Sequence, residues 1–459
     1  MKKCVSILVG LLPVFVLSLP GRAGFSGQAQ QPFAFIHAVI IDGNGGAPIS
    51  NGTLVIRGDR IEAVGRAEDI GVPPDAQVKD LAGKVLMPGL ADMHVHLLGG
   101  WDGEAVDMLG YRRYLNALLY AGVTTVLDTG NVKPYIIQLR QEIAAGRLLG
   151  PRIYCAGPLI DGPDPLWPPI TQTVSSVEQI PRIVRQLKAD HVDIIKVYVG
   201  LSNPMLWALA AEARKNSLPV FVDQSWRNGF PDLAAAGITA FVHTPDIITG
   251  DEMIKTLKER GVRFISTLAV VEAKSRRRLE DLRFLEYPLV KDTTPPDFVA
   301  GVRAEAMRCR ESKEWNSGPR EQNMKRFMQQ SANLKKLFDA GLFIAAGTDA
   351  PYPGVFQGEG IHREMELLVE AGVPPMDAIV MATRNAARLI GAGGEWGTLE
   401  PGKLANLLVI QGRPDQRIQD MRNIDRVVRL GRILDRERLK LNPDTDPGFL
   451  PVAPVSAIK

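Results

Sequence analysis

Cysteine is scarce in this chain, which has three in 459 residues. Cys4 lies in the N-terminal segment, so the body of the chain carries only Cys155 and Cys309. Two cysteines do not make a disulfide framework, which excludes the class of small secreted domains held together by disulfides. A single disulfide between them is the alternative in an oxidising compartment, but we expect both residues to serve as packing side chains.

The body of the chain also lacks an excess of charge. The formal net charge is +3, but residues 1–23 contain Lys2, Lys3 and Arg22 and no acid. Without these three, the 54 Lys and Arg fall to 51, which equals the 51 Asp and Glu. A nucleic-acid-binding protein would carry a basic surplus, so we expect no nucleic-acid partner.

Only one apolar run is long, and it stands near the N-terminus. Val5–Leu19 follows two lysines and precedes small residues, the layout of a secretory signal peptide with cleavage after Ala23 or Ala29. The run is shorter than the roughly 20 residues that a membrane-spanning helix needs, although an anchor is the alternative. We therefore predict a signal peptide at 1–29, export to the periplasm or the medium, and no membrane span in the mature chain.

Histidine is also rare, with six residues, yet two of them stand one residue apart as His94-Val95-His96. On a β-strand, positions i and i+2 point to the same side, so both imidazoles can face one metal ion. Neutral imidazole is a common zinc ligand. Taken alone, the pair is equally consistent with two histidines at a strand end without a metal.

The string around this pair, PGLADMHVHL at 88–97, resembles the PGxxDxHxH pattern of the first barrel strand in the amidohydrolase superfamily. Further matches follow in the same order through nearly the whole chain after the leader. They lie at 193–196, 236–243, 346–350, 362–372, 382–391 and 397–410. The chain looks closest to the imidazolonepropionase-like and prolidase-like branch.

The resemblance implies an α/β fold, a (β/α)8 TIM-like barrel with a small discontinuous β-sandwich domain formed from both chain ends. The residues agree, because β-rich runs lie at both ends and eight strand-like segments alternate with helix-like ones between them. The expected units are an N-terminal sandwich segment at 30–87, the barrel at 88–396, a C-terminal sandwich segment at 397–440 and a tail at 441–459. Residues 272–320 are charged and interrupt the alternation, so we predict a lid there, with a solvated helical excursion as the alternative.

Six residues stand at the family's metal-ligand positions, and they are His94, His96, Lys196, Asp223, His243 and Asp349. The resemblance implies that His94, His96 and Asp349 hold a first divalent ion, expected to be zinc. It also implies that Lys196 is carboxylated to a carbamate that bridges two ions. The alternative for Lys196 is a salt bridge to Asp193 or Asp349.

Asp223 is where the chain departs from the family pattern. The fifth strand should end in histidine, as in PVxVH, but residues 219–224 read PVFVDQ. Asp223 either ligates through its carboxylate, which keeps two ions, or the second ion is lost. A register slip that turns Gln224 inward is a third reading. We favour the retained carboxylate ligand.

The predicted reaction is metal-assisted hydrolysis of an amide or peptide C–N bond in a small substrate, such as an Xaa-Pro-like dipeptide or an N-acyl compound. Asp349 would take a proton from the attacking water and carry it to the leaving nitrogen. His243 would bind the second ion or hydrogen-bond the developing oxyanion. Loop residues expected to touch the substrate are Asp161, Tyr198, Trp226 and Arg227.

Two other classes of function remain open at this stage. A lactonase or phosphotriesterase would use the same activated water, and a non-catalytic ligand-binding barrel would explain a degenerate fifth strand. Barrels of the resembled family often pair, so a homo-oligomer is kept as an expectation.

Overall fold

The computed structural model describes residues 31–99, 107–223, 235–246, 250–312 and 318–442. The predicted signal peptide at 1–29 and all but the first two residues of the predicted tail lie outside these ranges. None of the helices within them has the length and apolar character needed to cross a membrane.

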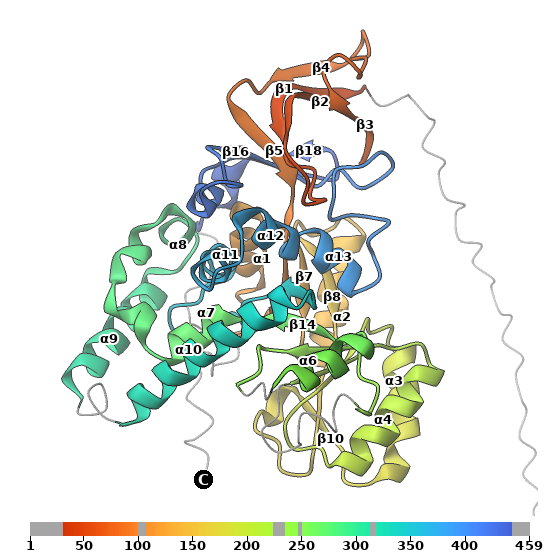
Figure 1. The fold of residues 1–459 in the computed structure, drawn as a ribbon, viewed down its shortest axis with the longest axis vertical. Helices are drawn as coiled ribbons and strands as arrows, with labels where there is room; N and C mark the ends of the chain where they lie inside the picture. Colours follow the sequence, from red (N-terminus) through yellow and green to blue (C-terminus); the bar gives the residue numbers. More distant parts are fainter. Residues whose placement is uncertain (1–30, 100–106, 224–234, 247–249, 313–317, 443–459) are drawn as a thin grey trace, which may run out of the picture.

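An eight-stranded sheet brings together the two ends of the chain (Figure 1). Its order is β18-β17-β16-β5-β1-β2-β3, and β4 pairs with β1. The strands are β1 Phe33–Ile40, β2 Ile49–Arg57, β3 Arg60–Arg66, β4 Gln77–Asp80, β5 Lys84–Pro88, β16 Leu407–Gln411, β17 Ile424–Arg429 and β18 Arg432–Ile433. Strands β5 and β16 run antiparallel, with Met87 opposite Leu408. The division of this unit into two sandwich layers stays a prediction.

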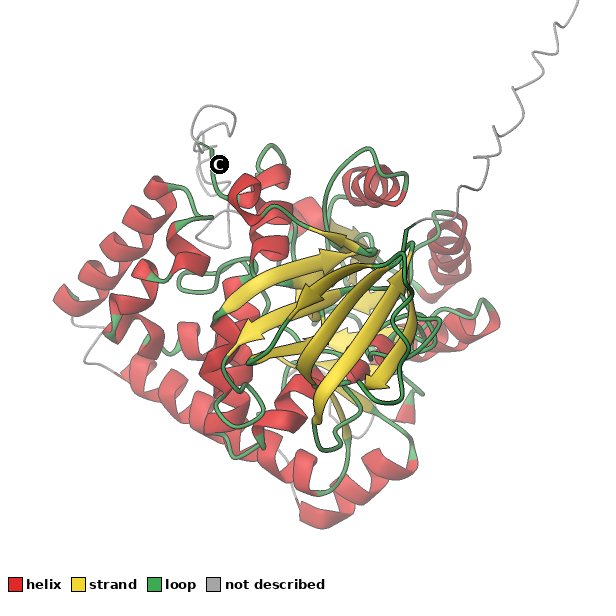
Figure 2. Cartoon of the chain, turned by 90° about the horizontal axis from the view of Figure 1, so that it is seen from above, coloured by secondary structure: helices red, strands yellow, loops and turns green. Residues whose placement is uncertain are grey.

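The sheet is held by apolar side chains from both chain ends. Phe35, Leu54, Leu86 and Val409 are buried in one cluster, with at most 1% of each exposed. Burying such side chains stabilises the fold by roughly 1.5–3 kcal/mol each. Seen from above, the strands run side by side with helices around them (Figure 2).

Two parallel sheets make up the body of the protein. One has the order β10-β9-β11-β12-β13-β14-β15 and the other β6-β7-β8. The strands are β6 Leu90–Val95, β7 Val123–Asp128, β8 Arg152–Cys155, β9 Leu159–Asp161, β10 Thr171–Thr173, β11 Ile195–Val197, β12 Val220–Asp223, β13 Ala240–Val242, β14 Arg263–Ser266 and β15 Phe343–Ala346. Most are buried along their length, which is typical of parallel strands covered on both faces.

The first parallel strand meets the loop after the last one. Val95 and Ala350 form a parallel bridge, and the Asp349 N–H donates to the His94 carbonyl at 2.8 Å. The His96 N–H likewise donates to the Ala350 carbonyl at 2.8 Å. These bonds place the carboxyl ends of β6 and β15 side by side.

Helices follow the parallel strands and bury their apolar faces. They are α1 Tyr111–Tyr120, α2 Lys133–Ala144, α3 Ile180–Ala189, α4 Asn203–Lys215, α6 Gly250–Glu259, α11 Glu359–Glu370, α12 Pro375–Met381 and α13 Arg384–Leu389. In α3 the buried residues are Ile180, Ile183, Val184 and Leu187, the i, i+3, i+4, i+7 spacing of one helix face.

The segment after β14 forms a helical excursion, seen at the side of Figure 1 as α8, α9 and α10. Its helices are α7 Leu268–Lys274, α8 Pro288–Lys291, α9 Pro296–Glu311 and α10 Gly318–Asp339. It has an apolar cluster of its own, which includes Leu279, Phe284 and Val302. The helical character agrees with the sequence, and the role of a lid stays a prediction.

One sequence-based boundary is wrong. The apolar run Val262–Val270 predicts a seventh strand along its whole length, but β14 ends at Ser266 and α7 begins at Leu268. A short, fully buried apolar run has no periodicity that distinguishes strand from helix. Cys155 and Cys309 are both free thiols.

Candidate metal centre

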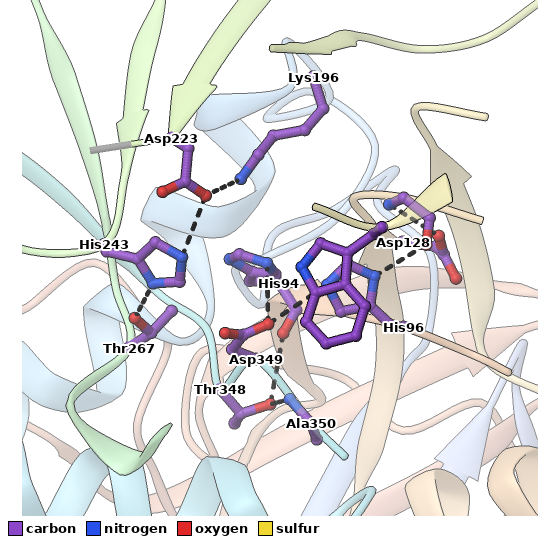
Figure 3. A network of polar contacts seen from close by, with 12 residues as sticks. His94, His96, Asp128, Lys196, Asp223, His243, Thr267, Thr348, Asp349 and Ala350 are labelled. Carbon is purple, nitrogen blue, oxygen red and sulfur yellow. Dashed lines mark hydrogen bonds and ion pairs between the residues drawn. The ribbon is translucent and has the colours of Figure 1, made fainter. Parts of the chain in front are cut away.

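His94, His96 and Asp349 come together where β6 and β15 end (Figure 3). His94 Nε2 and His96 Nε2 each lie 3.2 Å from Asp349 Oδ1. One ligand atom from each residue lies within 4.8 Å of the others. Among the described residues, no other set of three His, Cys, Asp or Glu side chains meets this condition.

The backbone beneath these ligands is fixed by Asp92. Its carboxylate accepts hydrogen bonds from the His94 N–H at 3.2 Å, the Thr348 N–H at 3.0 Å and the Thr348 hydroxyl at 2.7 Å. Burial raises the pKa of Asp92 to about 8. Gly347 is required here, because a Cβ at this position would lie 2.8 Å from the Cβ of His94.

The orientation of His96 is set by its second ring nitrogen. Nδ1 lies 2.8 Å from the Gly130 carbonyl, an acceptor, so Nδ1 carries the hydrogen and Nε2 presents a lone pair. Asp128 in turn holds this loop, accepting from the Leu97 N–H at 2.8 Å and the Asn131 side chain at 2.7 Å. Sequence reasoning missed Asp128, although an acid ending the buried strand VTTVLD was a visible signal.

The three ligand atoms fit a divalent cation. Burial lowers the pKa of His94 to about 3, which keeps its imidazole neutral. Burial alone would raise the pKa of Asp349, but the two imidazoles beside it hold it well below its ordinary value. A carboxylate oxygen therefore faces the lone pair of His96 at 3.2 Å, and only a shared proton or a cation relieves this repulsion. Two imidazoles and a carboxylate are a ligand set typical of zinc.

The other three predicted ligands form a neighbouring polar chain. Lys196 Nζ lies 2.9 Å from Asp223 Oδ2, and His243 Nε2 lies 3.3 Å from the same oxygen. His243 Nδ1 contacts the Thr267 hydroxyl at 2.5 Å. The ring centroids of His94 and His243 are 4.9 Å apart, so the two groups adjoin.

These contacts identify the salt-bridge partner of Lys196, which the sequence left open. The partner of Lys196 is Asp223, whereas Asp193 pairs with Arg140 at 2.8 Å. Burial would raise the pKa of Asp223, but the charge of Lys196 and the hydrogen bonds of Lys196 and His243 hold it well below its ordinary value. Thr267 was not predicted, because nothing in its spacing points toward His243.

Of the four residues predicted to contact the substrate, the structure describes Asp161 and Tyr198. Tyr198 follows β11, and its hydroxyl accepts a hydrogen bond from the Trp167 indole at 3.2 Å. Asp161 is buried and accepts from the Gly162 and Gly200 N–H groups at 2.9 and 2.5 Å, so it ties two loops together. Trp226, Arg227 and the alternative ligand Gln224 lie outside the described residues.

Comparison with known proteins also points to the amidohydrolase family. A model of the amidohydrolase family matches residues 85–434. An enamidase from Eubacterium barkeri is 31% identical over 389 residues, covering 81% of this chain and 84% of that protein. An imidazolonepropionase from Alkaliphilus metalliredigens is 23% identical and covers 85% of this chain and 92% of that protein. The crystal structure of a putative prolidase from Bifidobacterium longum superposes with a TM-score of 0.72 at 27% identity, covering 89% and 96% of the two chains.

The family match extends over most of the chain and contains His94, His96 and Asp349. The enamidase match is also long, so the likeness is not confined to one motif. The chain therefore belongs to the amidohydrolase family and is a hydrolase.

Proposed function

We propose that the protein is an exported metal-dependent hydrolase that cleaves an amide or peptide C–N bond in a small substrate. The observation that carries this proposal is the group His94, His96 and Asp349 at the ends of parallel strands, in which His94 is buried and the other two are half-buried. Active sites of α/β barrels lie at that end of the strands. The similar enamidase, imidazolonepropionase and putative prolidase support the choice of a C–N bond and a small substrate.

We also infer that the two parallel sheets belong to one closed (β/α)8 barrel. The Val95–Ala350 bridge supports this on one side, where β6 meets the segment after β15. On the other side, the Asp193 N–H donates to the Cys155 carbonyl at 2.9 Å, which links the end of β8 to the segment before β11. The (β/α)8 topology would bring all six predicted site residues to one rim.

His94, His96 and Asp349 would hold the ion, which is expected to be zinc. When bound, such an ion supplies a Lewis acid that polarises the scissile carbonyl and lowers the pKa of a water molecule. The protein's own residues would orient the ligands. Gly130 fixes the ring of His96, and Asp92 fixes the backbone of His94. Both supports are backbone-anchored, so the ligand atoms are positioned before substrate arrives.

Asp349 is the group placed to move the proton. Its side chain is 17% exposed, compared with 2% for His94, so it reaches the space that a substrate would enter. Oδ1 faces the two imidazoles, which leaves Oδ2 to accept a proton from the attacking water. The same carboxyl group then delivers the proton to the leaving nitrogen as the C–N bond breaks.

The test is hydrolysis by chelated and zinc-reloaded protein on a panel of Xaa-Pro dipeptides, N-acyl amino acids, lactones and phosphotriesters. The proposal predicts C–N hydrolysis that disappears on chelation and returns with zinc. The Asp349→Asn variant should lose roughly 10²–10⁴-fold in kcat, the share typical of a general acid-base group. Turnover of lactones or phosphotriesters alone would contradict the proposed bond, and no turnover with bound zinc would favour a ligand-binding protein.

Export needs its own experiment. The chain should be secreted by a host cell with its N-terminus beginning after Ala23 or Ala29, which N-terminal sequencing determines. An uncleaved chain that stays with the cells would contradict the signal peptide without affecting the chemistry.

A further inference from the structure

The two halves of the site differ in how their polar atoms are satisfied. At His94, His96 and Asp349, one possible ligand atom from each residue lies within 4.8 Å of the others. At Lys196 and Asp223, a donor faces an acceptor at 2.9 Å, and no cation is needed between them. The first half therefore calls for an ion, whereas the second half is already paired.

Burial strengthens the ion pair between Lys196 and Asp223. Lys196 is 1% exposed and Asp223 7% exposed. A buried ammonium group without a counter-charge is very costly, and Asp223 is the acid that pairs with Lys196 among the described residues. Removing either partner would leave the other as a buried, unbalanced charge.

His243 completes the same arrangement. Its Nε2 lies 3.3 Å from Asp223 Oδ2, the oxygen that Lys196 also contacts. With Nε2–H donating to this carboxylate, Nδ1 accepts from the Thr267 hydroxyl at 2.5 Å. Each polar group in the series Thr267, His243, Asp223 and Lys196 then has a partner, and Figure 3 shows His243 in contact with both Asp223 and Thr267.

Carboxylation of Lys196 would break this pairing. The ammonium group first loses a proton, the Nζ lone pair then joins the carbon of carbon dioxide, and the nitrogen releases a second proton, so the cation becomes an anionic carbamate. That anion would lie against the Asp223 carboxylate, where an ammonium now lies at 2.9 Å. A neutral histidine at position 223, as in the family pattern, would not oppose it.

We infer that the protein holds a single metal ion and that the Lys196 ammonium, fixed by Asp223, takes the place of the second one. This rests on the proposed function, because it assigns the other half of the same site. Of the two readings of Asp223 that the sequence left open, this is the loss of the second ion. Lys196 then contributes a permanent positive charge beside the first ion instead of a bridging ligand.

The experiment combines elemental analysis with ¹³C NMR of protein grown and reloaded with zinc and ¹³C-bicarbonate. We expect about one ion per chain in the wild type and no carbamate carbon signal. In Asp223→His, the ion count should rise toward about two and a carbamate signal should appear, because the counter-charge is gone and a neutral ligand has taken its place. The Lys196→Met variant shows whether any signal belongs to this lysine.

Asp190→His is the matched control, because Asp190 also pairs with a lysine, Lys133, at 2.6 Å but outside the site. It should keep the wild-type ion count. Two ions and a carbamate signal in the wild type would overturn the inference and leave the proposed function intact. A folded Asp223→His with one ion would also overturn it, because Asp223 would then not be what excludes the second ion. No ion in the wild type would overturn both.

Discussion

The residues that make this site work outnumber those that would touch an ion. His96 faces Asp349 because its other nitrogen binds the Gly130 carbonyl, and Gly130 is held by Asp128. Metal sites depend on such supporting hydrogen bonds for ligand orientation. The affinity of the site should therefore respond to a residue that binds no metal.

Asp128→Asn tests this dependence. The amide keeps the size of the side chain but replaces one acceptor oxygen with a donor, which opposes either the Gly130 N–H at Oδ1 or both the Leu97 N–H and the Asn131 amide at Oδ2. Zinc affinity should fall about 10–100-fold, measured by competition with a chelator of known affinity. Asp190→Asn is the control, and equal affinities in the wild type and Asp128→Asn would refute the supporting role.

Glu364 gives a prediction about pH. It is fully buried, accepts hydrogen bonds from Ser266 and from the Ala269 N–H, and burial raises its pKa from 4.5 to about 7. Between these two values the folded protein keeps a proton that the unfolded chain releases. The free energy of unfolding should therefore fall by roughly 3 kcal/mol as the pH rises through this window.

Urea unfolding of the wild type and Glu364→Gln at pH 5 and pH 8 measures this term. The variant cannot ionise, so its stability should decline less between the two pH values than that of the wild type. Parallel declines would show that Glu364 does not contribute to the pH dependence.

At this scale the sequence predicted which residue types stand at the strand ends, but not how they pair. The HxH pair is visible from its spacing, whereas Asp349 was predicted because residues 346–350 resemble the family pattern. The hydrogen bond from Thr267 to His243 and the pairing of Lys196 with Asp223 depend on side-chain directions in three dimensions. No local pattern in one sequence contains that information.

At the scale of elements, buried charges fasten the excursion to the rest of the protein. Glu359 begins α11 and is fully buried, with Arg278 at 2.7 Å and Arg422 at 2.8 Å. Arg278 lies in the excursion, and Arg422 lies between β16 and β17. Three separate segments thus meet on one carboxylate.

Arg422→Met should therefore destabilise the fold by about 3 kcal/mol, since it leaves Glu359 and Glu366 short of a partner. Arg308→Met is the matched control, because Arg308 pairs with Glu305 on the surface of α9 and is 69% exposed. Its cost should stay below about 1 kcal/mol. Urea unfolding at pH 7 compares the two, and equal losses would contradict the role of the buried network.

Element boundaries show what periodicity can and cannot predict. The sequence predicts a helix at 177–190, and α3 lies at Ile180–Ala189, because a polar face makes the helical period visible. The predicted end of β14 was wrong, because the residues that follow this strand are buried in α7 and have no polar face. The pairing of β5 with β16 joins segments more than 300 residues apart, and only the family resemblance pointed to it.

For the whole molecule, the ion would add a further link between strands that backbone hydrogen bonds already join. Its three ligands come from the first and last parallel strands, which share one bridge, Val95 with Ala350. A ligand that binds only the folded state stabilises it by about 2.7 kcal/mol at a concentration of 100 times Kd. Metal binding should therefore raise the melting temperature as well as support hydrolysis.

The most direct test of the central claim is the metal content of the purified mature protein, measured by elemental analysis beside His94→Ala. The account predicts about one zinc ion per chain in the wild type and almost none in the variant, because two ligands are too few for a stable zinc site. A wild type that holds no ion after reloading, or a His94→Ala variant that holds as much as the wild type, would contradict it.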